Sequence, residues 1–159
     1  PEECVIACKK LEELGIAAIE VSGGIAEKGL VIMKGDVPTD LLLKNRNIVE
    51  RMVVRMVEGS MKKAAAFEEA YFLPHAATVK KNVKVPVLAV GGMRTRRKME
   101  EALKSGQADF ISLCRPFIRQ PNLVKLLERD EGDPISCTSC NRCSMEILMQ
   151  HQPMRCYQA

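Results

Sequence analysis

Residues 84–92 read Lys84-Val85-Pro86-Val87-Leu88-Ala89-Val90-Gly91-Gly92. The apolar run from Val85 to Val90 has no polar alternation. Such a run is typical of a strand that is buried on both faces, as in a parallel sheet flanked by helices. The two glycines mark a tight turn at its end. The stretch therefore predicts a strand over 84–90 in an α/β protein.

Two further strands are predicted on either side of this stretch, over 16–21 and over 108–113, and each runs into a loop that carries Gly or Arg. Helical patterns lie between the strands and beyond them. They cover residues 2–14, 47–58, 61–82 (bent at Pro74), 95–104 (with Thr95 as N-cap) and 121–128, while 25–40 is expected to be a long loop. Alternating helices and strands require a parallel sheet with right-handed crossovers. Three strands cannot close a barrel, so we expect the chain to form part of a larger sheet.

Two side-chain groups on these helices are expected to pack in the core. The helix over 47–58 collects Ile48, Val49, Met52, Val53, Met56 and Val57 on one face. Cys4 and Cys8 lie one turn apart on the first helix and are interpreted as packing residues rather than ligands, because free cysteines are commonly buried.

The C-terminal segment carries Cys137, Cys140 and Cys143 at intervals of three, followed by Cys156. Neighbours this close lack the geometry for unstrained disulfides with one another. Four thiolates suit either a tetrahedral zinc ion or an iron–sulfur cube. A triplet plus one distant cysteine fits the cube better than the two pairs usual for zinc, and three reduced, unligated thiols remain the alternative. His151 lies within the span between the last two cysteines, where it is in reach of the centre.

Composition limits the classes of function. The 159 residues suffice for one domain with a sizeable core, and the net charge of +4 is spread along the chain. We therefore expect no nucleic-acid partner, and no apolar run is long enough for a membrane span. Seven cysteines without a signal peptide favour a reducing compartment, the cytoplasm. The chain begins at Pro1 within a helical pattern, which suggests that its beginning is missing.

Two consecutive strand–helix loops predict a phosphate site. Gly91 and Gly92 let backbone N–H groups approach an anion, and Arg115 supplies a fork of donors after the next strand. The alternatives are a simple tight turn at the glycines, or a barrel enzyme acting on a sugar phosphate. The latter leaves the cysteine spacing unexplained.

Several motifs in order resemble one family. They are Leu11–Gly15, Ile19–Gly24, Glu69–Pro74, Val90–Thr95, Ala108–Leu113 and Arg115–Arg119. With the cysteine spacing, they resemble the Old Yellow Enzyme-like NADH:flavin oxidoreductases, in the branch of trimethylamine dehydrogenase and 2,4-dienoyl-CoA reductase. Residues 25–66 show no such likeness.

The resemblance implies the C-terminal half of an FMN-binding (β/α)8 TIM barrel over 1–130, containing the sixth to eighth strands, and an iron–sulfur segment over 131–159. In this family the FMN phosphate is held at positions that correspond to Gly91, Gly92, Met93, Cys114 and Arg115. A [4Fe-4S] cluster is held at those of Cys137, Cys140, Cys143 and Cys156.

The implied full-length enzyme uses NAD(P)H to reduce FMN, and then reduces an activated alkene or passes electrons on. No catalytic residue is assigned, because the resemblance places the proton donor in the first half of the barrel. His75 and Tyr71 are interpreted as structural residues. We expect a small-molecule substrate, and either a homo-oligomer or association with the missing half. We expect no turnover by this chain alone. The rival is a non-catalytic half-barrel with a structural zinc site.

Overall fold

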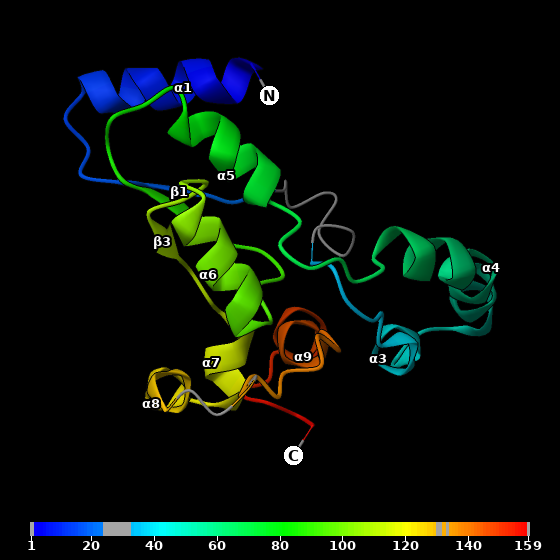
Figure 1. The fold of residues 1–159 in the computed structure, drawn as a ribbon. Coiled ribbons are helices and arrows are strands. Elements are labelled where there is room, and N and C mark those ends of the chain that lie inside the picture. Colours follow the sequence, from blue (N-terminus) through cyan, green and yellow to red (C-terminus); the bar gives the residue numbers. More distant parts are fainter. Residues whose placement is uncertain (1, 24–32, 130–131, 133, 159) are drawn as a thin grey trace. The chain divides into compact units, whose positions relative to one another are not determined.

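The computed structural model describes residues 2–23, 33–129, 132 and 134–158. Its helices are α1 (Glu2–Glu13), α3 (Thr39–Leu43), α4 (Ile48–Ala64), α5 (Leu73–Lys80), α6 (Arg96–Lys104), α7 (Arg115–Arg119), α8 (Leu123–Glu128) and α9 (Arg142–Gln150). Its strands are β1 (Ile19–Val21), β2 (Val87–Ala89) and β3 (Phe110–Ile111). Figure 1 shows these elements along the chain.

The chain divides into two compact units. The sheet unit comprises Pro1–Gly23, Glu69–Leu113 and Val124–Ile135, and the cysteine unit comprises Gly24–Glu68, Cys114–Leu123 and Ser136–Ala159. The predicted domains, 1–130 and 131–159, follow a different division and stay a prediction.

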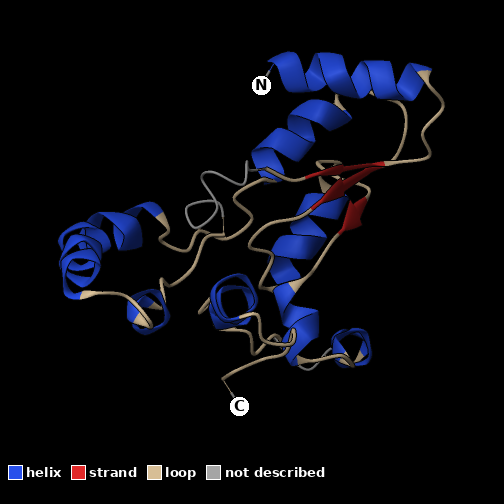
Figure 2. Cartoon of the chain, turned by 180° about the vertical axis from the view of Figure 1, so that it is seen from behind, coloured by secondary structure: helices blue, strands red, loops and turns tan. Residues whose placement is uncertain are grey.

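The sheet unit contains the three strands, which are parallel and lie in the order β1-β2-β3 (Figure 2). Ile19 lies opposite Val87, and Leu88 lies opposite Phe110. The α/β class and the parallel sheet are thus as predicted, and they are compatible with part of a (β/α)8 barrel. All three strands are shorter than predicted, beginning at residues 19, 87 and 110.

The core of the sheet unit lies between β2 and the helix that precedes it. Val87 and Ala89 of β2 are fully buried, as is Ala76 of α5. The helix α5 contacts β1 and β2 on one side and α1 on the other, so it lies between α1 and the strands in both views (Figures 1 and 2). Cys8 of α1 joins this core as predicted, whereas Cys4 is exposed, so the packing role predicted for Cys4 is wrong.

The start of α6 shows how a local signal fixes an element. The Thr95 hydroxyl accepts a hydrogen bond from the Lys98 backbone N–H at 3.2 Å, which is the N-cap predicted from the sequence. Gly106 follows the helix with a φ of 68°, a left-handed conformation that glycine adopts without strain.

The cysteine unit has a smaller apolar core, in which α3 packs against α4 and α9. Its buried residues are Val37, Leu41, Leu42, Ala65 and Met145. The helix α4 begins with a capping box in which Asn47 and Glu50 each accept a hydrogen bond from the other's backbone N–H.

The helix predicted over 47–58 is confirmed, but its predicted end at residue 58 and the single helix predicted over 61–82 are wrong. Instead, α4 continues through Gly59 and Ser60 to Ala64, because one glycine weakens a helix by only about 1 kcal/mol. The second helix is α5, which begins at Leu73, so Pro74 starts a helix instead of bending one.

The prediction that the apolar face of α4 packs in a core is also wrong. No residue of α4 is buried, and Met56 is 82% exposed. The other five residues of that face, Ile48, Val49, Met52, Val53 and Val57, are exposed as well.

Three short helices have no counterpart in the sequence prediction. They are α3, within and beyond the end of the predicted 25–40 loop, α7, and α9, which carries Cys143 in its first turn. The helix predicted over 121–128 begins later, at Leu123. Of the remainder of the predicted loop, residues 33–38 contain no helix or strand, as predicted, and residues 25–32 lie outside the described residues.

Candidate functional site

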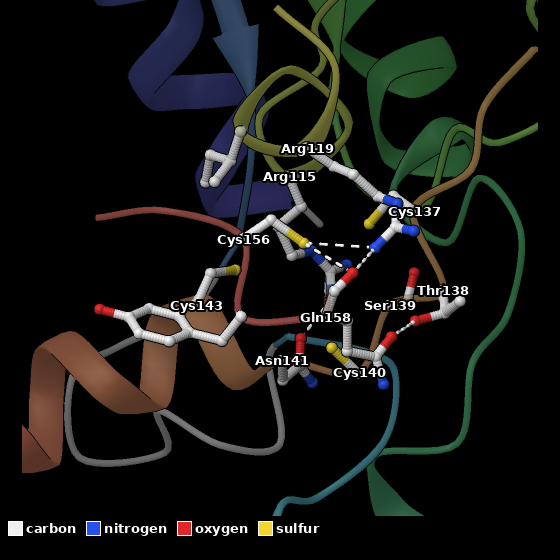
Figure 3. Close-up of a pocket in the computed structure, with 12 residues that line it drawn as sticks. Arg115, Arg119, Cys137, Thr138, Ser139, Cys140, Asn141, Cys143, Cys156 and Gln158 are labelled. Carbon is white, nitrogen blue, oxygen red and sulfur yellow. Dashed lines mark hydrogen bonds between the residues drawn. The ribbon is translucent and has the colours of Figure 1, made fainter. Parts of the chain in front are cut away.

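The four C-terminal cysteines line one pocket of the cysteine unit (Figure 3). Cys137 and Cys140 come from the extended segment before α9, Cys143 from the first turn of α9, and Cys156 from the segment after it. Two arginines of α7, Arg115 and Arg119, line the same pocket. Residues between positions 115 and 156 therefore bring four thiols and two guanidinium groups to one place.

This arrangement is not a closed site for a single ion. A tetrahedral zinc ion with Zn–S bonds of about 2.3 Å requires sulfur atoms about 3.8 Å from one another. Among the described residues, no three side chains of His, Cys, Asp or Glu are grouped so that they could hold a metal ion. The structure gathers the predicted ligands at one pocket, and their role as ligands stays a prediction. The donor set, four thiols with adjacent cations, fits a soft, negatively charged iron–sulfur centre.

Asn141 fixes the loop between Cys140 and Cys143. It is 3% exposed and adopts a left-handed conformation with a φ of 59°. Its side-chain Nδ2 donates to the carbonyl oxygens of Met33 at 2.8 Å and Asp36 at 2.9 Å. Its Oδ1 accepts from Arg115, so one amide holds the loop through three hydrogen bonds.

Gly35 allows the same loop to approach closely. The Asp36 backbone N–H donates to the Ser139 carbonyl oxygen at 2.9 Å. Gly35 has a φ of 147°, and a Cβ atom there would lie 2.0 Å from that oxygen. Only glycine therefore fits this contact between residues 33–36 and the cysteine loop.

Both arginines of α7 join separate segments of the chain through hydrogen bonds from their guanidinium groups. Arg115 Nη1 donates to the Lys34 carbonyl oxygen at 3.0 Å as well as to Asn141. Arg119 donates through Nε to Ser136 Oγ at 2.9 Å and through Nη1 to Cys156 Sγ at 3.4 Å. Neither the Asn141 contact nor the Arg119 contacts have a local sequence signal, because they join residues at least 17 positions apart.

Burial and charge shift the pKa values of two groups of the cysteine unit in opposite directions. Burial raises the pKa of the Cys143 thiol, and hydrogen bonds from Ser144 oppose that effect. Arg142 forms a two-pronged ion pair with Asp40, with N···O distances of 2.9 and 2.7 Å. The hydrogen bond from Arg142 is the main cause of a lowered pKa of the Asp40 carboxyl. Arg142 thus points its charge at a carboxylate.

The predicted phosphate loop after β2 is shaped by packing. Gly91 and Gly92 have φ values of 104° and 71°. A Cβ atom on Gly91 would lie 2.7 Å from the Phe72 ring and 3.0 Å from the Tyr71 ring, so the glycine is required for packing in this unit. Met93 is 4% exposed, and its side chain belongs to the core.

Glu69 lies before α5 and contacts this loop, and sequence reasoning did not identify it as functional. Its Oε1 accepts from the Thr95 backbone N–H at 2.7 Å, from the Thr95 hydroxyl at 2.8 Å and from the Arg94 backbone N–H at 3.3 Å. These donors open α6, where an anion is favoured. A carboxylate of the chain itself therefore accepts from the two backbone amides that follow Met93 of the predicted anion site.

The five predicted FMN-phosphate residues fall in both units. Gly91, Gly92 and Met93 belong to the sheet unit, whereas Cys114 and Arg115 belong to the cysteine unit, so their assembly into one site stays a prediction. His75 is exposed on α5. His151 ends α9, is exposed and does not line the cysteine pocket.

Comparison with known proteins identifies the family of this chain. The sequence model of the NADH:flavin oxidoreductase / NADH oxidase family matches residues 25–133, so the chain belongs to this family. The match includes residues 25–66. The prediction that these residues show no likeness to the family is therefore wrong.

Three relatives illustrate the similarity. A 4,4'-dithiodibutanoate disulfide reductase of Rhodococcus erythropolis is 25% identical over 82% of this chain and 32% of its own length. An NADH oxidase of Thermoanaerobacter brockii is 29% identical over 98% of this chain and 20% of its own length. A cinnamate reductase of Clostridium sporogenes is 28% identical over 56% of this chain and 14% of its own length.

These alignments differ in how much of the cysteine segment they include. The chain spans about a third or less of each of these relatives. The family match ends at residue 133, whereas the alignment with the NADH oxidase leaves out so little of the chain that it includes Cys137 to Cys143.

In the part of the chain that the structure describes, no helix is both long and apolar enough to cross a membrane.

Proposed function

We propose that this chain is part of an FMN-dependent NAD(P)H oxidoreductase, in which Cys137, Cys140, Cys143 and Cys156 hold a [4Fe-4S] cluster. The observation that carries the proposal is the gathering of these four cysteines at one pocket, in a chain that belongs to the NADH:flavin oxidoreductase / NADH oxidase family. The residues of this chain would hold FMN, which would supply hydride chemistry with NAD(P)H, and a cluster, which would supply single-electron transfer.

The residues of this chain would serve mainly to hold and orient these groups. In the proposed enzyme the backbone at Gly91, Gly92, Met93 and Cys114 and the guanidinium of Arg115 hold the FMN phosphate. Arg115 would have to exchange its present partners, Lys34 and Asn141, for the phosphate or share its remaining N–H groups with it. The left-handed glycines and the fork of Arg115 are the features that support this assignment.

The proposed architecture is the C-terminal part of a (β/α)8 barrel. The three parallel strands in sequential order are compatible with it. We propose that the rest of the barrel comes from chain beyond these residues, that the protein acts in the cytoplasm, and that it is a homo-oligomer. The final acceptor is a small molecule, such as an activated alkene, or an electron carrier. The names of the relatives, a cinnamate reductase and a disulfide reductase among them, support a small organic acceptor.

The first test is the absorption spectrum of protein purified without oxygen, before and after dithionite, together with iron, acid-labile sulfide and zinc analysis. We expect a broad visible shoulder that bleaches on reduction, and about four irons and four sulfides per chain. Resolved flavin bands would add support for FMN binding by this chain. Stoichiometric zinc without sulfide would favour the rival, a non-catalytic half-barrel with a structural zinc site.

Two matched variants sharpen this test. Cys140→Ser removes a thiol from the pocket and is expected to lose most of the iron. Cys4→Ser removes an exposed thiol of α1, outside the pocket, and is expected to keep it. Equal iron in both variants would contradict the assignment of ligands. Steady NADH oxidation by these 159 residues alone would contradict the proposal that the rest of the barrel is needed for turnover.

A further inference from the structure

We propose that Arg119 is a positioning residue for the iron–sulfur centre: it holds the distant ligand Cys156 at the pocket and makes the centre easier to reduce. This inference rests on the proposed function. The Arg119 guanidinium contacts Ser136 at one end of the cysteine segment and Cys156 and Gln158 at the other, and Figure 3 shows the contacts to Cys156 and Gln158.

Arg119 contacts residues on both sides of the cysteine segment. Arg119 Nε donates to Ser136 Oγ at 2.9 Å, directly before Cys137. Its Nη1 donates to Cys156 Sγ at 3.4 Å and to the Gln158 carbonyl oxygen. One side chain thus joins the start of the cysteine triplet to the fourth cysteine.

Such a link is needed because Cys156 is separated from the triplet. It lies thirteen residues after Cys143, with α9 in between. Thr138 Oγ1 adds a second contact across the same gap, donating to Gln158 Oε1 at 2.6 Å. The fork of Arg119 is suited to this task, because its donors are fixed in one plane and less side-chain entropy is lost for each hydrogen bond formed.

Arg119 also brings a positive charge next to the proposed centre. A four-iron centre with four thiolate ligands is negative, and reduction adds one more negative charge. A guanidinium that donates to a ligand sulfur stabilises the reduced form more than the oxidised form, so the reduction potential rises. No bond is made or broken in this step: one electron from the reductant enters the centre.

Two other arginines near the predicted ligands have their described hydrogen bonds and ring contacts elsewhere. Arg142 pairs with Asp40, and the Arg155 guanidinium lies over the Tyr157 ring at 4.9 Å from its centre. Arg155 directly precedes Cys156 in sequence, so it offers a control that changes the net charge by the same amount beside the same ligand.

The experiment compares the whole chain with Arg119→Gln, Arg119→Lys and Arg155→Gln. All four proteins are prepared anaerobically, analysed for iron and sulfide, and titrated with dithionite against redox mediators while the visible absorption is followed. In Arg119→Gln we expect about a tenfold smaller equilibrium constant for one-electron reduction, which corresponds to a potential about 59 mV more negative. Arg119→Lys keeps the charge and is expected to restore most of this shift. Arg155→Gln is expected to leave the potential within a few millivolts of wild type.

The outcomes separate this inference from the proposed function. Wild-type protein without iron and sulfide would overturn both. Full iron in the wild type, with an unchanged potential in Arg119→Gln, would overturn the inference alone, as would an equal shift in Arg155→Gln. If Arg119→Gln loses its iron, the Lys variant decides: restored iron and a near-wild-type potential support the role of the charge, and iron loss in both supports positioning by the planar fork. Iron loss in Arg155→Gln to the same extent would overturn both forms of the role.

Discussion

The sheet unit and the cysteine unit are stabilised by different kinds of contact. In the part of the chain that the structure describes, the sheet unit has a cluster of fourteen buried residues, all apolar side chains, around three parallel strands. The cysteine unit has five such residues, and its loops are joined by the polar contacts of Asn141, Arg115 and Arg119.

This difference indicates that the cysteine unit depends more on a bound ligand for its stability than the sheet unit does. Apolar burial contributes roughly 25 cal/mol for each Å² removed from water and requires no ligand. Polar contacts between loops contribute only about 0.5–1.5 kcal/mol each, but they fix geometry. A unit with a small core and a directed polar network is suited to hold a centre, and a ligand that binds the native state stabilises it further.

The largest expected effect tests the close approach of the cysteine loop. Gly35→Ala places a Cβ 2.0 Å from the Ser139 carbonyl oxygen, so the backbone must shift. We expect a loss of about 4 kcal/mol or more, since such a change combines a clash with a strained φ. Hydrogen exchange should show faster exchange in 136–158, with unchanged protection of β2.

Gly59→Ala is the control for this change. Gly59 lies within α4 and nothing lies within 4 Å of an added Cβ, so alanine should stabilise the protein by about 1 kcal/mol. Destabilisation of similar size in both variants would contradict a specific contact at Gly35.

The next effect tests the polar network. Asn141→Ala removes three hydrogen bonds of a buried side chain, so we expect a loss of about 3 kcal/mol. Asn141→Gly keeps the left-handed backbone and isolates the loss of the side chain. Urea unfolding measures both, with Asn82→Ala as control, because the exposed Asn82 makes one hydrogen bond, to Thr78. A loss below 1 kcal/mol for Asn141→Ala would show that this network contributes little.

A third effect tests the apolar core of the sheet unit. Val79 of α5 is 1% exposed, and Val79→Ala removes two methyl groups from a packed site. We expect a loss of about 2 kcal/mol, from lost burial and the cavity that remains. Proteolysis should then cleave near α5 while the cysteine segment stays resistant. Cleavage that begins between 136 and 158 would contradict separate stabilisation of the units.

The smallest effect concerns the dependence of stability on pH. Asp109 accepts from Lys80 Nζ at 2.8 Å and from the Val87 backbone N–H at 2.7 Å, and these bonds lower the pKa of its carboxyl. A carboxyl with a lower pKa in the folded state contributes stability above its unfolded pKa of about 3.9, and loses it as the pH falls through the folded value.

We therefore expect Asp109→Asn to be less stable than wild type by about 1 kcal/mol at pH 6, a difference that shrinks below about pH 4. Urea unfolding at pH 6 and pH 3 measures it. Asp40→Asn, at an ion pair of the other unit, serves as the comparison, and a difference at Asp109 that does not depend on pH would show that charge has no part in it.

The elements that could be predicted are those with local signals. The first helix, the Thr95 cap and the three strands follow from residues within one or two turns of each other. The helix predicted over 61–82 fails because long-range contacts end α4: Gly35 N–H donates to the Ala65 carbonyl oxygen, and Lys34 Nζ to that of Ala64. Alanine favours a helix, and nothing near it in sequence reveals those partners.

The candidate site follows the same rule. Cysteine spacing alone predicts that the four thiols converge, and they do line one pocket. The contacts that organise the pocket join Arg119 to Cys156 and Asn141 to Met33, 37 and 108 positions apart. Chemistry carried by residue type is visible in a sequence, whereas contacts made by folding are not.

The order of the strands along the chain has a consequence for synthesis on the ribosome. Val21 of β1 pairs beside Ala89, but the partner strand begins only at Val87, 66 residues later. At about 5–20 residues per second, β1 waits roughly 3–13 s for β2. The gap between β2 and β3, from Ala89 to Phe110, is 21 residues and takes only about 1–4 s. Of the three strands, β1 therefore exposes its apolar side chains longest during translation, and we expect Ile19 and Val21 to need protection before the side chains of the other strands do.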